Sequence, residues 1–423
     1  MSEQDDSAYS GYLKDPYTGA RVEEEDAYIP LDRDGVRLYP VPQYDLSRLD
    51  SLPKRGSAAG IFRFQPLLPV EKTGVISLGE GDTALIPLTG LGADLDMHEL
   101  YLKDESRNPT WSYKDRLAAV AVTKAAQQGR STVIVSSTGN HGAAVAAYAA
   151  KAGMQCIVLT LESVPEAMKT LIQSYGAKVF AFKEPTQRWT VMRQAVAERG
   201  WVPMSGFVSP PSGSNPYGVE GYKSIAYELY EQLDAVPDAV VVPVAYGDGL
   251  AGILRGFQEL VQLGLTSSVP RMVAAEPFGP YAASLRDGFV SGATVPYGPS
   301  VAFSIASPMA TWQGWNALVE SNGCAARADD ELIMRAQGAL AAGDGLFLEA
   351  SSAITAAVLP DLLARGAIER DERVVLLGTS TGLKDIPATA ARLNRVPVIE
   401  PTLDALDRAL ADTDIVASAS GSR

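Results

Sequence analysis

One lysine stands where it could do chemistry. Lys114 lies in the stretch NPTWSYKDRLAAVAV (residues 108–122), between a tyrosine and an aspartate and just ahead of an alanine-rich, helix-like run. A lysine amine can form an imine with a carbonyl compound, and once freed it can act as general base and acid. Only two histidines are present, His98 and His141, so a Ser-His-Asp triad or a histidine-rich metal site has little to draw on. Lys114 is therefore the first candidate for a catalytic residue.

Three polar loops each follow an apolar run. VSSTGNHG (135–142) precedes a helix that is predicted to begin after His141. The free backbone N–H groups at the start of that helix would attract a carboxylate. PVAYGDGLAG (243–252) carries glycines that would let backbone amides cradle a phosphate, but it lacks the Lys-Ser/Thr of a nucleotide P-loop and departs from the dinucleotide fingerprint. LLGTSTGLKD (376–385) offers hydroxyl groups to a flat heterocycle. Each loop taken alone could equally be an ordinary capped turn.

Together with Lys114, the loops meet the requirements of one cofactor. An imine-forming lysine, a phosphate cradle without nucleotide-specific residues and hydroxyl partners for a ring are what pyridoxal 5'-phosphate needs. This cofactor would also explain the shortage of histidines, because it stores the electrons released at the substrate Cα while the lysine moves the proton.

The elements that would position these loops alternate along the chain. From about residue 100, β-branched apolar runs precede alanine-rich runs that end in glycine. The expected strands are STVIVSS, QCIVLTL, AKVFAF, DAVVVPVAY, RMVAAEP and RVVLLGTS. Continuous apolar strands separated by helices predict an α/β protein with parallel sheet covered on both faces. Ligands in such sheets bind where loops leave the carboxyl ends of the strands, which is where the three loops lie.

Composition narrows the class of protein. A chain of 423 residues exceeds the usual size of one core, so two domains are expected. With 46% apolar and 20% charged residues and no apolar run of membrane-spanning length, the composition predicts a soluble protein without a membrane role. The net charge of −14, without a basic cluster, argues against nucleic acid. Cys156 and Cys324 predict neither a disulfide framework nor a metal site, and the acidic, polar start of the chain predicts a cytoplasmic location.

Seven segments in a fixed order give the chain a family resemblance. They are SLGEGDTALIPL (77–88), NPTWSYKDR, SSTGNHG, NPYGVEGYKSIAYEL (215–229), SIASPMATW (304–312), FLEASSAITAAVL (347–359) and TSTGLKD (379–385). In that order they resemble the motifs GEG-T-PL, NPTGSFKDR, STGN, NP-R-EGQKT-A-E, IGSPASW, FVEPASAA and TG-GLKD of threonine synthases. The resemblance covers nearly the whole chain. It implies a two-domain, fold-type II pyridoxal-phosphate enzyme of the tryptophan synthase β superfamily, with parallel-rich twisted sheets covered by helices.

The resemblance also implies a role for each candidate residue. Lys114 would hold the cofactor as a Schiff base and be the catalytic residue, Asn140 would bond the cofactor's 3′ oxygen, and Thr379 would face its pyridine nitrogen. A hydroxyl there does not enforce a protonated ring, which favours elimination and replacement over transamination. The residues expected to bind the cofactor phosphate are Ala245, Tyr246, Gly247, Asp248, Gly249 and Leu250. The residues expected to contact the substrate are Trp111, Ser137, Thr138, Gly139 and His141.

Three departures from the family motifs bear on the substrate. Gly218 replaces an arginine that, in the family pattern, binds the phosphate of O-phosphohomoserine. Losing such a bidentate partner lowers the binding free energy of the phosphate by about 1.5–3 kcal/mol. The negative charge of Asp248 would weaken the binding of a dianion further. Trp111 replaces a glycine and would either reshape the pocket or pack at the domain boundary. The substrate therefore stays open between O-phosphohomoserine and a differently activated amino acid.

The ends of the chain differ from its middle. Residues 1–75 are expected to form an N-terminal extension of turns and short strands, in which DPYTG and DRDG resemble zinc-ribbon knuckles without their cysteines, so no metal is expected. The large cofactor domain is expected over 76–106 and 225–405, a small mobile domain over 107–224, and a mobile C-terminal tail over 406–423.

The predicted activity is that of a lyase in amino-acid biosynthesis, nearest to threonine synthase, acting by elimination or replacement on an activated amino acid. The family implies a homodimer. A serine/threonine dehydratase or a specialised β/γ-replacement enzyme is the second possibility. A non-catalytic relative that binds the cofactor or an amino acid is the third, and retention of Lys114, Asn140 and Thr379 together argues against it.

Overall fold

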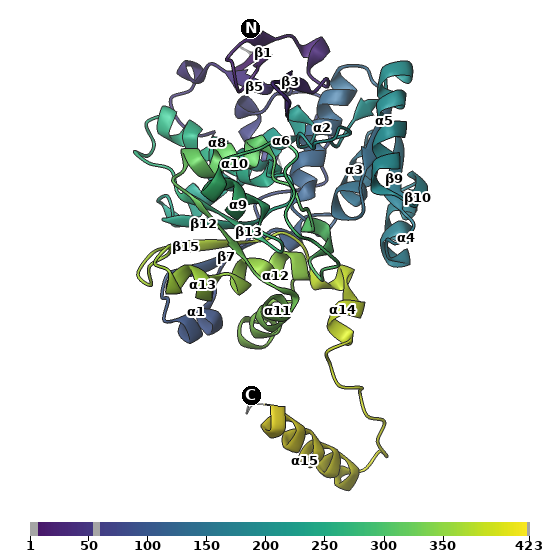
Figure 1. The fold of residues 1–423 in the computed structure, drawn as a ribbon, viewed down its shortest axis with the longest axis vertical. Helices are drawn as coiled ribbons and strands as arrows, with labels where there is room; N and C mark the ends of the chain where they lie inside the picture. Colours follow the sequence, from purple (N-terminus) through teal and green to yellow (C-terminus); the bar gives the residue numbers. More distant parts are fainter. Residues whose placement is uncertain (1–6, 54–59, 421–423) are drawn as a thin grey trace. The chain divides into compact units, whose positions relative to one another are not determined.

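Two compact units make up the chain, residues 1–384 and residues 385–423. The computed structural model describes residues 7–53 and 60–420 (Figure 1). The first unit contains a six-stranded and a four-stranded sheet, together with all the residues predicted to bind cofactor or substrate. None of the helices in the described residues combines the length and apolar composition that crossing a membrane requires.

The six-stranded sheet has the order β14-β13-β12-β15-β7-β6. Its strands are β6 (Leu85–Pro87), β7 (Leu100–Asp104), β12 (Ala239–Pro243), β13 (Arg271–Glu276), β14 (Cys324–Arg327) and β15 (Val374–Gly378). All neighbouring strands run parallel except β6, which is antiparallel to β7 at the edge. Every residue of β12 and β15 is buried, as expected for strands covered on both faces. The predicted α/β fold is confirmed.

Alternate residues of the central strands face two different helical layers. In β12, Val240 and Val242 pack in the cluster that contains α8 (Asp248–Gln262) and α10 (Trp312–Glu320). Ala239 and Val241 face the other way, into the cluster with α11 (Asp330–Asp344) and α12 (Ala350–Ala357). Figure 1 shows these helices on opposite sides of the sheet. The remaining helices of the two layers are α1 (Thr89–Leu95), α7 (Lys223–Leu233), α9 (Pro280–Asp287) and α13 (Leu359–Ala364).

The four-stranded sheet is parallel throughout, in the order β10-β9-β8-β11. Its strands are β8 (Thr132–Ser136), β9 (Gln155–Leu161), β10 (Lys178–Phe182) and β11 (Val202–Pro203). Its helices are α2 (Lys114–Gln127), α3 (Asn140–Lys151), α4 (Glu166–Ser174) and α5 (Pro185–Arg199). Val133 and Val135 of β8 share a cluster with α2 and α3, whereas Ile134 packs with Met192 of α5 on the other face. Helix α3 begins at Asn140, slightly before the predicted start after His141.

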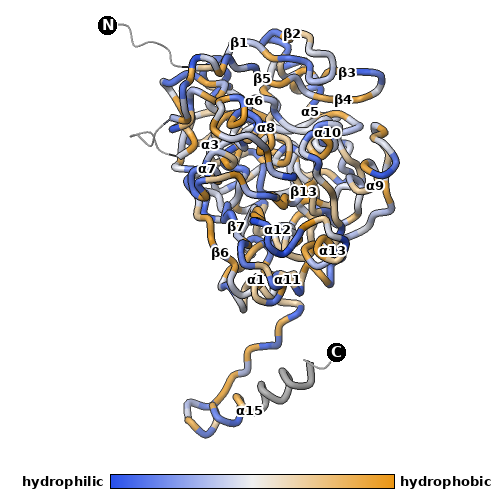
Figure 2. Tube along the Cα trace, turned by 90° about the vertical axis from the view of Figure 1, so that its left-hand side faces the viewer, coloured by the Kyte–Doolittle hydropathy of each residue, from blue (hydrophilic) through white to orange (hydrophobic). Residues whose placement is uncertain are grey.

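The N-terminal extension forms two small sheets, β2-β1-β5 and the hairpin β3-β4. The strands are β1 (Tyr9–Lys14), β2 (Arg21–Val22), β3 (Leu31–Arg33), β4 (Val36–Leu38) and β5 (Val41–Tyr44), and Figure 2 shows hydrophilic and hydrophobic residues mixed along them. The extension packs on α2 and on α6 (Pro216–Val219): Lys124 Nζ lies 2.6 Å from Glu24 Oε1, and the rings of Tyr28 and Tyr217 meet edge to face.

A buried charge network fixes the start of α2. Arg116 pairs with Glu105 at 2.7 Å and with Glu228 at 2.6 Å, and Lys103 Nζ lies 2.7 Å from the other oxygen of Glu228. Burial alone would raise the pKa of Glu228, but the charges of Arg116 and Lys103 hold it well below its ordinary value. Removing one member of such a network typically costs about 3–5 kcal/mol. The network therefore ties α2, which begins with Lys114, to β7 and α7.

The second unit contains α14 (Ile386–Ala390) and α15 (Leu403–Ser420). The residues expected from 406 onward as a tail are therefore helical up to Ser420. The boundaries proposed for the large, small and N-terminal domains stay a prediction.

Candidate active site

Two stacked tyrosines surround the amine of Lys114. Lys114 is the first residue of α2, and its Nζ donates hydrogen bonds to Tyr113 Oη at 3.2 Å and to Tyr222 Oη at 3.1 Å. The two rings stack with their centroids 4.8 Å apart. Burial, together with the neighbouring Tyr113, raises the pKa of Tyr222 well above its ordinary value, so its phenol stays protonated. The oxygen of each phenol therefore accepts a hydrogen bond from the Lys114 amine.

Sequence reasoning missed this pair of tyrosines. The signal was present, because the family motifs have phenylalanine where this chain has Tyr113 and glutamine where it has Tyr222. Neither difference indicates a contact by itself, since 108 residues separate Tyr222 from Lys114.

The turn between β12 and α8 lies against the same pair. Gly247 has φ +73°, and a Cβ there would come within 2.5 Å of the Cα of Gly314. A Cβ on Gly249 would lie 3.0 Å from the ring of Tyr113. The carbonyl oxygen of Tyr246 accepts hydrogen bonds from Thr311 Oγ1 and from Gln313. The turn thus brings bare backbone amides at the start of a 15-residue helix close to Lys114, as a phosphate cradle requires.

Asp248 is engaged by neutral donors. Its carboxylate accepts hydrogen bonds from the backbone N–H of Ser214 at 2.8 Å, from the Ser214 hydroxyl at 3.0 Å and from Gln313 Nε2 at 2.7 Å. The side chain therefore joins the turn to α10 and to the segment before α6. Whether its charge disfavours a dianionic ligand stays a prediction.

Ser137 holds the loop after β8 together by hydrogen bonds to the backbone of that loop. Ser137 Oγ accepts hydrogen bonds from the backbone N–H groups of Gly139 and Gly142, at 3.2 and 2.9 Å. Thr138 lies in the same turn, directly before α3. The loop and the start of α3 keep the geometry of a helix N-terminus, where a carboxylate is favoured.

Asn140 brings two further residues into the site. Its Nδ2 donates to Glu349 Oε2 at 2.8 Å, and its Oδ1 accepts from Lys384 Nζ at 2.7 Å. Burial lowers the pKa of Lys384 to about 8, against the opposing charges of Glu349 and Asp115. Sequence reasoning did not select Glu349 or Lys384, although both lie in segments that match family motifs.

His141 is neutral in the folded protein. Burial and the nearby charge of Lys114 lower its pKa to about 3, and its Nε2 has no hydrogen-bond partner among the residues that the structure describes. An uncharged imidazole next to the lysine can accept or donate a hydrogen bond, but it adds no positive charge at neutral pH.

The third loop is joined directly to the segment that carries Lys114. The carbonyl oxygen of Thr379 accepts from the backbone N–H of Tyr113 at 3.0 Å, and Ser380 forms a β-bridge with Ser112. The Thr379 hydroxyl lies 2.7 Å from Ser352 Oγ. The structure thus brings Lys114, the glycine turn between β12 and α8, Thr379 and Asn140 into one region, while the role of each residue stays a prediction.

Gly218, which stands where the family motif has arginine, packs closely against α2. A Cβ there would lie 2.9 Å from Leu117 Cγ and 3.0 Å from the Cβ of Ala121, both on α2. The sequence has glycine instead of the arginine, and in the structure the space beside this glycine is filled by apolar side chains of α2.

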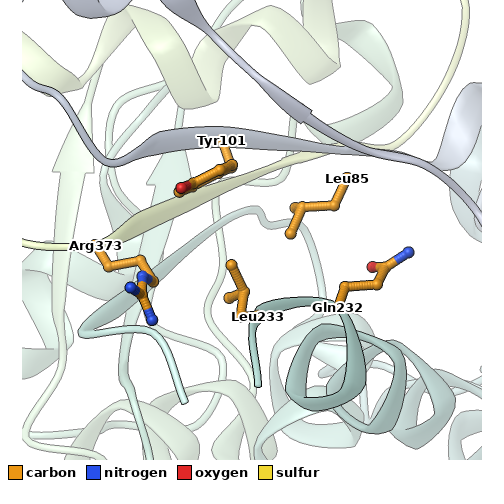
Figure 3. Close-up of a pocket in the computed structure, with 5 residues that line it drawn as sticks. All are labelled: Leu85, Tyr101, Gln232, Leu233 and Arg373. Carbon is orange, nitrogen blue, oxygen red and sulfur yellow. The ribbon is translucent and has the colours of Figure 1, made fainter. Parts of the chain in front are cut away.

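Two of the cavities among the described residues of the first unit differ in their relation to the site. The larger of the two, of about 380 Å³, is lined by Leu85, Tyr101, Gln232, Leu233 and Arg373, and Figure 3 shows these side chains around it, from β6, β7, the end of α7 and the residue before β15. None of these five residues belongs to the predicted site. The smaller cavity, of about 230 Å³, is lined by Trp111 and Lys384 among others and therefore adjoins the site.

The chain matches a known family over most of its length. Residues 76–380 match the family described as "Pyridoxal-phosphate dependent enzyme". The chain belongs to this family. The enzyme is 36% identical to a threonine synthase of Methanocaldococcus jannaschii, over 83% of this chain and 87% of the relative. It is 32% identical to a threonine synthase of Methanosarcina acetivorans, over 94% and 98% of the two chains.

Solved structures show the same fold. Maize serine racemase superposes on the enzyme with a TM-score of 0.62 at 21% identity, covering 73% of this chain and 91% of the other. A fungal L-serine ammonia-lyase from Rhizomucor miehei gives a TM-score of 0.61 at 22% identity, covering 73% and 96%. The predicted family, fold and cofactor are confirmed.

The residues present fit pyridoxal phosphate. The glycine turn at the start of α8 allows a close approach of the backbone to the ring of Tyr113, because a Cβ on Gly249 would lie 3.0 Å from that ring, and Lys114 reaches the same ring pair. The chemistry of the donors suits the cofactor, because the amides favour a phosphate and the lysine amine suits an aldehyde. The enzyme is a pyridoxal-phosphate-dependent lyase that acts by elimination or replacement, close to threonine synthase.

Proposed function

We propose that the enzyme eliminates a γ-substituent of an activated amino acid and adds water at Cβ, as threonine synthase does, and that O-phosphohomoserine is the first substrate to test. The observation that carries this proposal is the placement of Lys114, with its amine held 3.1 and 3.2 Å from the hydroxyl groups of two tyrosines beside the glycine turn of α8. The threonine synthases at 32–36% identity support it.

Each group of the site has a task in this proposal. Pyridoxal phosphate, when bound, supplies an electron sink for the bond broken at the substrate Cα. Lys114 removes the Cα proton and returns a proton to the carbon skeleton. Tyr113 and Tyr222 accept hydrogen bonds from its amine and hold it in place. The backbone N–H groups around Ser137 and the start of α3 orient the substrate carboxylate.

The proposal extends to the roles that the resemblance assigns. Asn140 and Thr379 would contact the cofactor's 3′ oxygen and pyridine nitrogen, and the turn from Ala245 to Leu250 would bind its phosphate. We also propose a cytoplasmic homodimer, supported only by the family resemblance; light scattering on the eluting peak of a sizing column would measure the oligomeric state.

A second candidate is elimination or replacement on an amino acid without a phosphate. The observation that favours it is Gly218, which stands where the family pattern has arginine and where even a Cβ would lie within 3.0 Å of Leu117 and Ala121 on α2.

One assay separates the two candidates. Phosphate and threonine are followed together after O-phosphohomoserine is added to the purified, cofactor-loaded enzyme, to Lys114→Ala and to Lys151→Ala, a control at an exposed lysine of α3. Coupled release by wild type and by Lys151→Ala, but not by Lys114→Ala, is the result expected of a threonine synthase. No release from an enzyme that keeps its visible cofactor absorbance would refute that substrate. Ammonia and a 2-oxo acid would identify a dehydratase.

A further inference from the structure

The smaller cavity beside the site is apolar on most of its walls. It has a volume of about 230 Å³ and lies between α4, which contributes Met168 and Leu171, and the loop around Leu383. Trp111 closes a third side. Two of these large apolar side chains stay open to solvent, since Trp111 is 46% exposed and Leu383 is 71% exposed. Exposed apolar groups around a concavity mark a binding surface rather than a core.

The backbone of Trp111 is strained to hold its indole there. Its φ is +60°, in the left-handed region that a bulky residue rarely adopts. Its backbone is clamped on both sides, because its N–H donates to the carbonyl of Asn108 at 2.7 Å and its carbonyl accepts from Ser380 Oγ at 3.1 Å. The glycine of the family motif would take this φ without strain. A tryptophan kept in a conformation suited to glycine indicates a use for its side chain.

Lys384 connects the cavity to the predicted substrate site. Lys384 also lines the cavity, and its Nζ lies 6.0 Å from the centre of the Trp111 ring and donates to Asn140 Oδ1 at 2.7 Å. Asn140 begins α3, the helix whose N-terminus is proposed to hold the substrate carboxylate. Trp111 itself precedes Lys114 by three residues. A substrate held by its carboxylate at α3 could therefore extend its side chain toward Trp111.

The surroundings of Gly218 point in the same direction. The space beside it is occupied by Leu117 and Ala121, so the family's guanidinium for a phosphate has no place there. Resting on the second candidate above, an amino acid without a phosphate, we propose that the enzyme's substrate carries an uncharged, apolar side-chain group, and that the cavity lined by Trp111, Met168, Leu171 and Leu383 binds it. Lys384 marks the polar end of the cavity, toward the substrate's Cα.

The test measures binding rather than turnover. Unreactive straight-chain L-amino acids, from alanine through 2-aminobutyrate and norvaline to norleucine, are titrated into the cofactor-loaded enzyme, and Kd is read from the shift of the visible cofactor absorbance. Burial of each further methylene should lower Kd about fourfold. O-phosphohomoserine should bind more weakly than norleucine.

Two variants locate the effect in the cavity. Trp111→Gly, which relieves the positive φ, and Leu383→Gln, at an exposed position, should each flatten the dependence of Kd on chain length. Leu332→Gln, at the exposed leucine of α11, is the matched control and should keep it.

Each outcome bears on the proposal. A Kd that does not change with chain length, or a dependence that survives both cavity variants, would overturn the apolar pocket while leaving the proposed function intact. An enzyme whose cofactor absorbance responds to no amino acid would overturn both the pocket and the proposed function.

Discussion

Gly218→Ala is expected to destabilise the enzyme, although alanine is the better helix former. Gly218 lies in α6, where its N–H donates to Asn215 Oδ1 at 2.9 Å. The added Cβ would lie 2.9 Å from Leu117 Cγ and 3.0 Å from the Cβ of Ala121, closer than side-chain carbons normally approach. Overpacking of this kind costs about 1–3 kcal/mol, against a gain of up to about 1 kcal/mol from helix propensity. With the full gain subtracted, the net expectation is a loss of up to about 2 kcal/mol.

Urea unfolding followed by circular dichroism measures this loss as a shift of the midpoint. Gly338→Ala is the matched control, because Gly338 lies inside α11 and a Cβ there would meet no atom within 4 Å. Its midpoint should rise. Gly218→Arg should lose more stability than Gly218→Ala, because it adds a charged side chain to the same crowded place.

A rise in the midpoint of Gly218→Ala, equal to that of Gly338→Ala, would refute the reasoning. It would mean that α2 can move away from α6, and Gly218→Arg would then become a fair way to restore the phosphate ligand of the family. A fall in the midpoint would mean that α2, which begins with Lys114, is held too tightly for that arginine to return.

Two further predictions concern protons. Tyr222→Phe removes the hydroxyl that accepts a hydrogen bond from the Lys114 amine at 3.1 Å, so proton transfer by Lys114 should slow and kcat should fall by about tenfold, for a hydrogen bond of about 1.4 kcal/mol, with a smaller change in KM. An unchanged kcat would contradict this. Because His141 titrates at about 3 instead of 6.5, the folded enzyme binds fewer protons than the unfolded chain between those values and loses stability as the pH falls. His141→Asn should remove up to about 1.4 kcal/mol of that loss per pH unit, measured from urea midpoints between pH 4 and 7, and equal slopes would refute it.

Much of the framework could be read from local patterns. Composition alone predicts the apolar strands, because a strand buried on both faces must be apolar throughout. The strands predicted in this way include β8, β9, β12, β13 and β15. The three polar loops were expected to carry the ligands, since ligands of parallel sheets bind where loops leave the carboxyl ends of the strands. The loop after β8 belongs to the four-stranded sheet, whereas the loops after β12 and β15 belong to the six-stranded one. The motif around Lys114, together with these loops, predicted pyridoxal phosphate as the cofactor. Helix α15 was not expected, because its last residues are the small and polar ones that usually form mobile tails.

The sequence by itself determined the family, the cofactor and the candidate lysine, because each is written in residues close together along the chain. Only the tertiary structure decided what surrounds that lysine. Tyr222 reaches it across 108 residues, and Glu349 and Lys384 reach Asn140 across 209 and 244. Such contacts depend on how strands and crossovers stack, which no local period encodes. The closed space at Gly218 has the same origin, because it is made by a helix from another part of the chain.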